Sequence, residues 1–167
     1  GLARAVDMSP ASLYTYFDSL DALFTELILR SYRSLAAAVR SGVDAFRDRS
    51  PGDRILAGPF AYRRWALHHR GEFNLVFTDQ LAGYAAEPGG ATVEAQTAVF
   101  APMIEAARAA DEPDGDPQRD RPAVPGPGGV PPEVERLMGV FGCFHGLTSL
   151  EVNHHLDWLD APATFEK

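Results

Sequence analysis

The sequence predicts an all-α protein, and three observations support that fold class. Apolar residues recur at spacings of three and four along most of the chain, which is the period of one helix face. Short breaks rich in Gly, Pro and Asp separate these apolar segments. A chain of 167 residues, of which 46% are hydrophobic, is also long enough to bury one sizeable core. We therefore expect a globular protein built from helices.

The first element is a pair of short helices joined by a tight turn. Residues 2–6 continue a helical pattern that stops before Ser9. Ser9 followed by Pro10 is a helix start in which Ser caps the helix and Pro occupies its first turn. Leu13 and Phe17, four residues apart, share one face of the new helix and leave its other sides open. Two helices separated by a turn of about three residues predict a helix-turn-helix.

At these residues the chain resembles the TetR family of bacterial transcriptional regulators. The family pattern is a small residue, a turn, Ser, a Leu-Tyr-x-aromatic-Phe run and then an aliphatic helix. The matching residues here are Ala5, Met8, Ser9, Leu13, Tyr14, Tyr16, Phe17 and Leu23. The resemblance implies an N-terminal domain that binds operator DNA. Without it, the same residues describe an ordinary helical hairpin whose aromatic side chains belong to a core.

The chain departs from the family pattern in three respects. Asp7 stands in the turn where the family usually has Gly, a mild change because Asp tolerates a positive φ better than most residues. Leu20 stands where the family commonly has Lys or Arg, which removes one contact to a phosphate. Gly1 falls inside what corresponds to the family's second helix. We therefore expect this sequence to be a fragment that lacks the first helix.

The resemblance implies that the second short helix contacts DNA. The residues that we predict at this contact are Ser9, Pro10, Ala11, Ser12, Tyr14, Thr15 and Tyr16. Ser9 and the tyrosine hydroxyls are expected at phosphates, and Ser12 and Thr15 nearest to base edges. The net charge of −8 opposes DNA binding, but residues 1–50 hold six Arg and six acidic residues and are neutral. The excess acid therefore lies away from the expected DNA contact.

A longer helix follows the cap at Ser19 and continues to the break at residues 47–52. Its apolar stripe consists of Leu23, Phe24, Leu27, Ile28, Leu35, Val39, Val43 and Phe46. Arg30, Arg33 and Arg40 fall off this stripe and are expected on a solvated face. The resemblance implies that this helix links the two domains and moves when a ligand binds.

Two helical segments follow this break, over residues 55–70 and residues 72–84. Gly58 and Pro59 are expected to bend or delay the first segment, and Gly71 to separate it from the second. Both segments place aromatic side chains at helical spacing. We expect those side chains to face an interior.

The next helix spans residues 91–110, and Pro102 near its middle is expected to kink it. A pocket beside such a bend suggests a site for a small, mostly apolar organic effector. The residues predicted to line or border it are Trp65, Phe73, Phe77, Phe100, Met103, Phe141 and His145. The alternative is that many of these side chains are simply core residues.

Residues 111–132 are rich in Pro, Gly, Asp and Arg, and we expect them to form a disordered loop. A last helix then spans residues 133–155, with glycines that permit close approach of another helix. Its FHGLTSLEV run resembles a WHG-type C-terminal domain found in one branch of the TetR family. We predict a two-fold homodimer paired through this helix and the C-terminal segment. The candidate interface residues are Phe141, Phe144, Leu147, Thr148, Glu151 and Val152.

The sequence offers little support for metal binding or catalysis. Glu151 and His154 form one Glu-x-x-His pair, whereas di-metal helical bundles need that pair twice. We therefore expect no metal and no other cofactor. The sequence also has neither a Gly-rich phosphate loop nor a nucleophile elbow, so we expect no enzymatic activity. Cys143, the single cysteine, lies between apolar neighbours and is predicted to be a buried structural thiol.

Taken together, the residues and the resemblance predict a TetR-family, ligand-responsive repressor that binds palindromic operator DNA. Residues 1–46 form the partial helix-turn-helix domain with its linker helix, and residues 47–167 the ligand-binding and dimerisation domain. No signal-peptide pattern or membrane span is present in the sequence, so a cytoplasmic location is expected. The alternative is a helical ligand-binding or metal-dependent protein that does not bind DNA.

Overall fold

The computed structural model describes residues 19–78, 89–111 and 132–159, and these ranges form five helices and no strand. The helices are α3 (Leu20–Asp44), α4 (Pro51–His68), α5 (Arg70–Phe77), α6 (Ala91–Asp111) and α7 (Pro132–Val152). The predicted all-α fold class is confirmed for this part of the chain. None of these five helices is long and apolar enough to cross a lipid bilayer.

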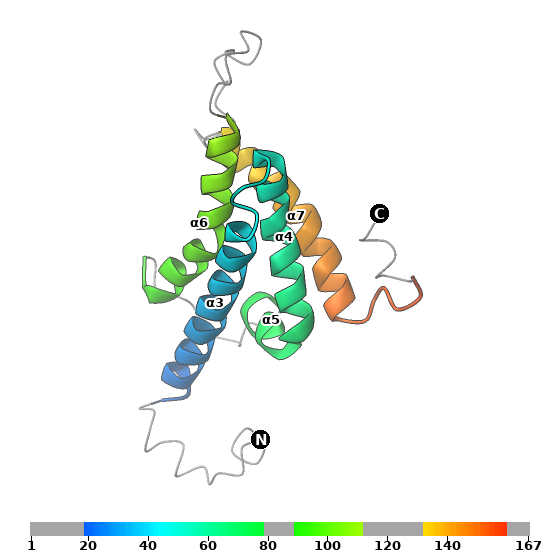
Figure 1. Ribbon diagram of the computed structural model, residues 1–167. Coiled ribbons are helices and arrows are strands. Elements are labelled where there is room, and N and C mark those ends of the chain that lie inside the picture. Colours follow the sequence, from blue (N-terminus) through cyan, green and yellow to red (C-terminus); the bar gives the residue numbers. More distant parts are fainter. Residues whose placement is uncertain (1–18, 79–88, 112–131, 160–167) are drawn as a thin grey trace.

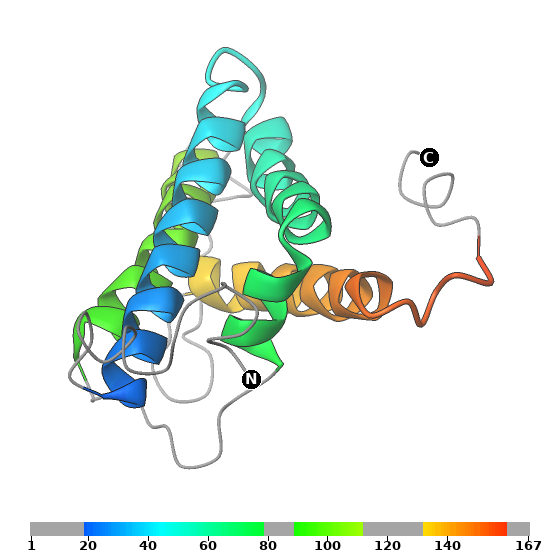
Figure 2. The ribbon, with the colours of Figure 1, turned by 90° about the horizontal axis from the view of Figure 1, so that it is seen from below.

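Helix α3 lies between α6 and α4, and the three helices enclose the core (Figure 1). The short α5 packs against α3 and α4, and α7 packs on α4 and α6. Seen from below, α7 runs across the other long helices and extends away from them (Figure 2). Fully buried side chains fill the space where these helices meet, among them Leu35, Val39, Tyr62, Val99 and Met103.

Helix α3 begins where the sequence predicts. Ser19 has an extended backbone and its hydroxyl accepts a hydrogen bond from the Ala22 N–H at 3.1 Å, as an N-cap does. Five residues of the predicted stripe are buried, namely Leu23, Ile28, Leu35, Val39 and Val43. Phe46 lies beyond the end of the helix and is 43% exposed, which differs from the prediction. The predicted solvated arginines are exposed, and Arg40 pairs with Glu105 of α6 at 2.7 Å.

Helix α4 starts at Pro51, and Gly58 and Pro59 do not delay it. Gly58 is needed because a Cβ there would overlap the Cγ of Met103, so α4 and α6 meet closely at this point. The break between α4 and α5 falls at His69 rather than at Gly71, which lies inside α5. The prediction placed this break two residues too late.

Helix α7 ends at Val152, earlier than the predicted position 155. The His154 N–H bonds the Glu151 carbonyl at 3.2 Å and the His155 N–H bonds the Leu150 carbonyl at 2.8 Å. This is a Schellman end, and His154 occupies its left-handed position with a φ of 64°. The apolar pattern continues past this end, so periodicity alone could not locate it.

Two of the predicted features fall outside the described residues. The helix-turn-helix and all seven predicted DNA contacts lie within residues 1–18, and most of the predicted loop lies within residues 112–131.

Candidate functional site

Five rings from three helices gather on one side of the bundle. Tyr62 comes from α4, Phe73 and Phe77 from α5, and Phe141 and His145 from α7. The Tyr62 ring centroid lies 5.2 Å from that of Phe141 and 5.8 Å from that of Phe77. The His145 ring lies 5.0 Å from Phe77 and 5.8 Å from Phe73. We call these five residues the aromatic cluster.

The aromatic cluster contains one polar pair, because the Tyr62 hydroxyl lies 2.7 Å from Nδ1 of His145. Burial raises the pKa of the Tyr62 phenol far above its usual range, so the phenol keeps its proton and is able to donate to Nδ1. Burial lowers the pKa of His145, so its ring is neutral near pH 7 and Nδ1 accepts. When the phenol donates to Nδ1, the ring proton of His145 sits on Nε2, where it can be donated to another group.

Thr148 follows His145 by about one helical turn of α7, so the two residues lie on the same side of that helix. It shares the inward face of α7 with Phe141 and Val152, which are both buried. Its side chain is 0% exposed, and its hydroxyl has no hydrogen-bond partner among the described residues. A buried hydroxyl without a partner costs about 1–3 kcal/mol. The inward face of α7 thus carries a polar group that the described part of the chain does not satisfy.

The structure brings four of the seven predicted effector residues into the aromatic cluster, namely Phe73, Phe77, Phe141 and His145. Phe100 of α6 borders the cluster, since its ring lies 4.8 Å from that of Phe141. Met103 is fully buried beneath Gly58 and belongs to the same core. The role of these residues toward a ligand stays a prediction.

Trp65 is the predicted effector residue that the structure places apart from these rings. Its ring stacks on His69 at a centroid distance of 4.9 Å, and its Nε1 donates to the Ser34 hydroxyl at 3.0 Å. It therefore faces α3 rather than α7. Tyr62 and Thr148, in contrast, are site residues that sequence reasoning missed. A hydroxyl on the apolar face of a helix was the available signal for both.

An ion pair joins α4 to α7 beside the aromatic cluster. Arg63 Nε donates to Glu151 Oε2 at 2.7 Å, and a second guanidinium nitrogen donates to the other carboxylate oxygen at 2.5 Å. The side chains of Arg63 and Glu151 are only 17% and 11% exposed. A bidentate and nearly buried pair of this kind fixes the relative position of two helices.

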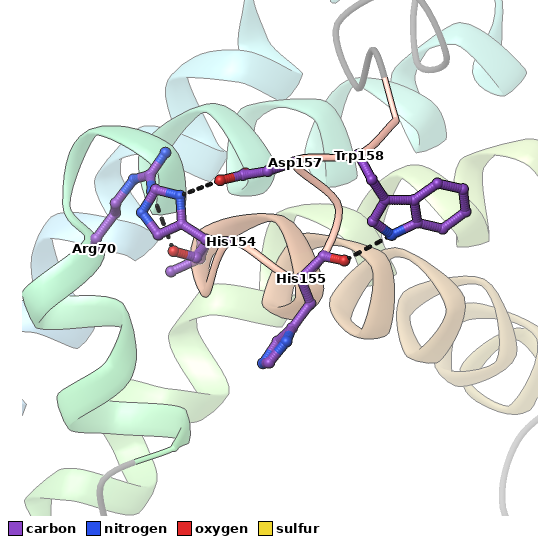
Figure 3. Close-up of polar contacts among 6 residues, drawn as sticks. Arg70, His154, His155, Asp157 and Trp158 are labelled. Carbon is purple, nitrogen blue, oxygen red and sulfur yellow. Dashed lines mark hydrogen bonds and ion pairs between the residues drawn. The ribbon is translucent and has the colours of Figure 1, made fainter.

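This pairing also separates the two members of the Glu-x-x-His motif. Figure 3 shows His154 between Arg70 and Asp157, with the His154 Nε2 atom 2.6 Å from a guanidinium nitrogen of Arg70. The same nitrogen of Arg70 donates to the Val152 carbonyl at 3.2 Å, so Arg70 also satisfies the end of α7. Within the described ranges, no group of three or more His, Cys, Asp or Glu side chains could hold a metal ion.

The comparison with known proteins decides the family. A family model described as "Tetracyclin repressor-like, C-terminal domain" matches residues 55–167, which is more than half of the chain. The chain belongs to the TetR family of transcriptional regulators. The resemblance seen at its N-terminal residues and the helical bundle of its C-terminal part agree with this assignment.

Several curated proteins resemble this TetR-family chain. They include the HTH-type transcriptional regulator Mb1846 of Mycobacterium bovis and the HTH-type transcriptional regulator Rv1816 of Mycobacterium tuberculosis. Each is 31% identical to this chain over 87 residues, a stretch that covers 52% of this chain and 37% of the relative. The matched stretch thus spans little more than a third of each relative's length.

The outward face of α7 in this TetR-family protein is apolar and open. Cys143 is exposed, so the prediction of a buried structural thiol is wrong. A Cβ added to any of the three neighbouring glycines would meet nothing within 4 Å; these are Gly139, Gly142 and Gly146. Leu147 and Leu150 on the same helix are 44% and 42% exposed. We call these six residues the α7 outer face.

Most of the interface residues predicted from the sequence lie outside the α7 outer face. Phe141, Thr148 and Val152 are buried in the protein's own core, and Glu151 pairs with Arg63. Of the predicted set, Leu147 remains well exposed, while Phe144 contacts Phe60 of α4 with its ring. The helix is apolar on both sides, and the buried side faces its own bundle.

Proposed function

We propose that this TetR-family protein is a ligand-responsive repressor that binds palindromic operator DNA as a homodimer in the cytoplasm. Residues 1–46 supply the partial DNA-binding domain and its linker helix, and residues 47–167 the effector-binding and dimerisation domain. The aromatic cluster beside the unpartnered Thr148 hydroxyl is the observation that supports a ligand most strongly. A polar group left unsatisfied among rings favours a ligand that satisfies it.

The effector in this proposal is a small, mostly apolar organic molecule that carries one hydrogen-bonding group. Its apolar body packs against the rings of Phe73, Phe77 and Phe141. Its polar group accepts a hydrogen bond from Nε2 of His145 and exchanges one with the Thr148 hydroxyl. The wider set of residues predicted to line or border the effector also contains Trp65, Phe100 and Met103.

Contacts of α5 with α3 provide a route from this site to DNA. The Tyr32 ring of α3 lies edge-on against Phe77 at 6.0 Å, and its hydroxyl donates to the Val76 carbonyl at 3.4 Å. Phe77 in turn contacts His145 in the aromatic cluster. A ligand that displaces α5 therefore shifts α3, which begins directly after the proposed DNA-binding residues.

DNA binding is tested by electrophoretic mobility shift of the full-length protein with the DNA that flanks its own gene. The proposed contacts are Ser9, Pro10, Ala11, Ser12, Tyr14, Thr15 and Tyr16. We expect Tyr16→Phe combined with Thr15→Ala to weaken the complex and to change its salt dependence. Thr97→Ala, on an exposed site of α6, is the matched control. An affinity and salt slope equal to those of the parent protein would contradict the assignment.

Dimerisation through the α7 outer face is tested by light scattering at micromolar concentration. We expect a dimer, and we expect Leu147→Glu to shift it to a monomer because a carboxylate would be buried at the contact. Cys143 serves as a reporter, since helices that cross at the glycines bring the two thiols within reach of a short bismaleimide. Cys143→Ser should abolish this cross-link without changing the size. A monomeric parent protein rules out the dimer.

A further inference from the structure

The surface formed by α3 and α4 is hollowed into two adjoining clefts of about 430 and 300 Å³. They share Ala61 and Arg64 as lining residues, so they adjoin along α4. Most of its other lining side chains on α3 are small, such as Ala38 and Gly42. A Cβ on Gly42 would overlap that of Ala61, so α3 and α4 are in close contact at this point. We call the two clefts together the α3–α4 groove.

One end of the α3–α4 groove has large apolar side chains that remain partly exposed, although the Phe60 ring also contacts Phe144 of α7. Phe46, Leu56 and Phe60 all line the larger cleft, and they are 43%, 45% and 44% exposed. Large apolar side chains gathered at a concave site mark a place where an apolar group binds. The volume of the larger cleft is in the range of small-molecule sites, about 300–1,000 Å³.

The α3–α4 groove carries a positive charge at one place and a negative charge at another. Arg64, between the two clefts, makes no ion pair with the described residues, although Arg40, Arg47 and Arg63 each pair with an acid. Asp53 lines the larger cleft on the side where α4 begins, and its carboxylate accepts a hydrogen bond from Ser50 at 2.8 Å. An anion is therefore attracted to Arg64, between the two clefts, and repelled from the end of the larger cleft near Asp53.

We propose that the α3–α4 groove binds an anionic amphiphile, a molecule with a carboxylate and a linear alkyl chain. The carboxylate pairs with the Arg64 guanidinium, and the chain lies over Phe60, Leu56 and Phe46. The site is separate from the aromatic cluster, because Phe60, Ala61 and Arg64 line the groove whereas Tyr62 of the same helix faces α5 and α7. The proposal therefore does not depend on the effector site described above.

Trp65 lines the smaller cleft and provides an internal fluorescent reporter. The other tryptophan, Trp158, is 78% exposed and can be replaced by Phe without disturbing the core. In this Trp158→Phe background, we expect decanoate to change the emission of Trp65 with saturable binding. Decanol, which has the same chain and no charge, should bind about tenfold more weakly. Equal affinity for the two probes would overturn the proposal.

Two substitutions locate the binding site. Arg64→Gln should weaken decanoate binding about tenfold and leave decanol unchanged, and Arg33→Gln, an exposed arginine of α3 outside the groove, is the matched control. Ser41→Phe, which fills the larger cleft, should abolish binding of both probes, whereas Ala37→Phe one turn earlier on α3 should not. If neither Arg64→Gln nor Ser41→Phe weakens decanoate binding, the probe binds elsewhere and the proposed site is refuted. Loss of a dimer on Ser41→Phe would instead make the groove an interface between copies, and would equally refute it.

Discussion

Replacing Thr148 by Val tests whether the inward face of α7 is built for a ligand rather than for stability. The two side chains have nearly the same shape, so the substitution exchanges the unpartnered hydroxyl for a methyl group and opens no cavity. Thr148 is 0% exposed and its hydroxyl has no partner in residues 19–78, 89–111 and 132–159, so this part of the fold carries most of the desolvation penalty of that group. We expect Thr148→Val to raise the free energy of unfolding by about 1–2 kcal/mol.

The measurement is urea denaturation of the full chain, followed by circular dichroism and fitted with a common m-value. Ser31→Ala is the control, because the Ser31 hydroxyl is equally buried but donates to the Leu27 carbonyl at 2.8 Å. That substitution should lower the free energy of unfolding by about 1 kcal/mol. If Thr148→Val destabilises the protein as Ser31→Ala does, the hydroxyl is satisfied in the folded state and the argument for a ligand there fails.

Three further predictions follow from the packing of α4. Burial lowers the pKa of His145 below its unfolded value of 6.5, so the free energy of unfolding should decrease as the pH falls below about 6.5. Denaturation at several pH values should show that His145→Leu flattens this dependence. Glu151→Ala removes the carboxylate that Arg63 holds and should lower the free energy of unfolding by roughly 3 kcal/mol. The double substitution Arg63→Met and Glu151→Leu, which removes both charges, should recover most of that stability. Gly42→Ala should lower the melting temperature, at a cost of about 1–3 kcal/mol, because the added methyl overlaps a rigid neighbour. Gly71→Ala, with open space around it, should be neutral or stabilising. Equal effects of the two substitutions would contradict the close approach of α3 and α4 at Gly42.

The sequence by itself determined the fold class and, for α3, both the start of the helix at Ser19 and its buried stripe. These two features of α3 depend on capping chemistry and on local spacing. Both are properties of adjacent residues, so they can be recognised before any packing is known. The family pattern near Tyr14 is local in the same sense, and the family assignment agrees with it.

The tertiary structure decided which face of each helix meets which neighbour. Helix α7 is apolar on both sides, so its sequence could not show that Thr148 points inward and Cys143 outward. Trp65 and Tyr62 lie three residues apart on α4, a spacing that favours one shared side, yet Trp65 faces α3 and Tyr62 meets α7. The reason is that the neighbour of a side chain lies far away in sequence, as Tyr62 and His145 do, and periodicity within one helix carries no information about that neighbour.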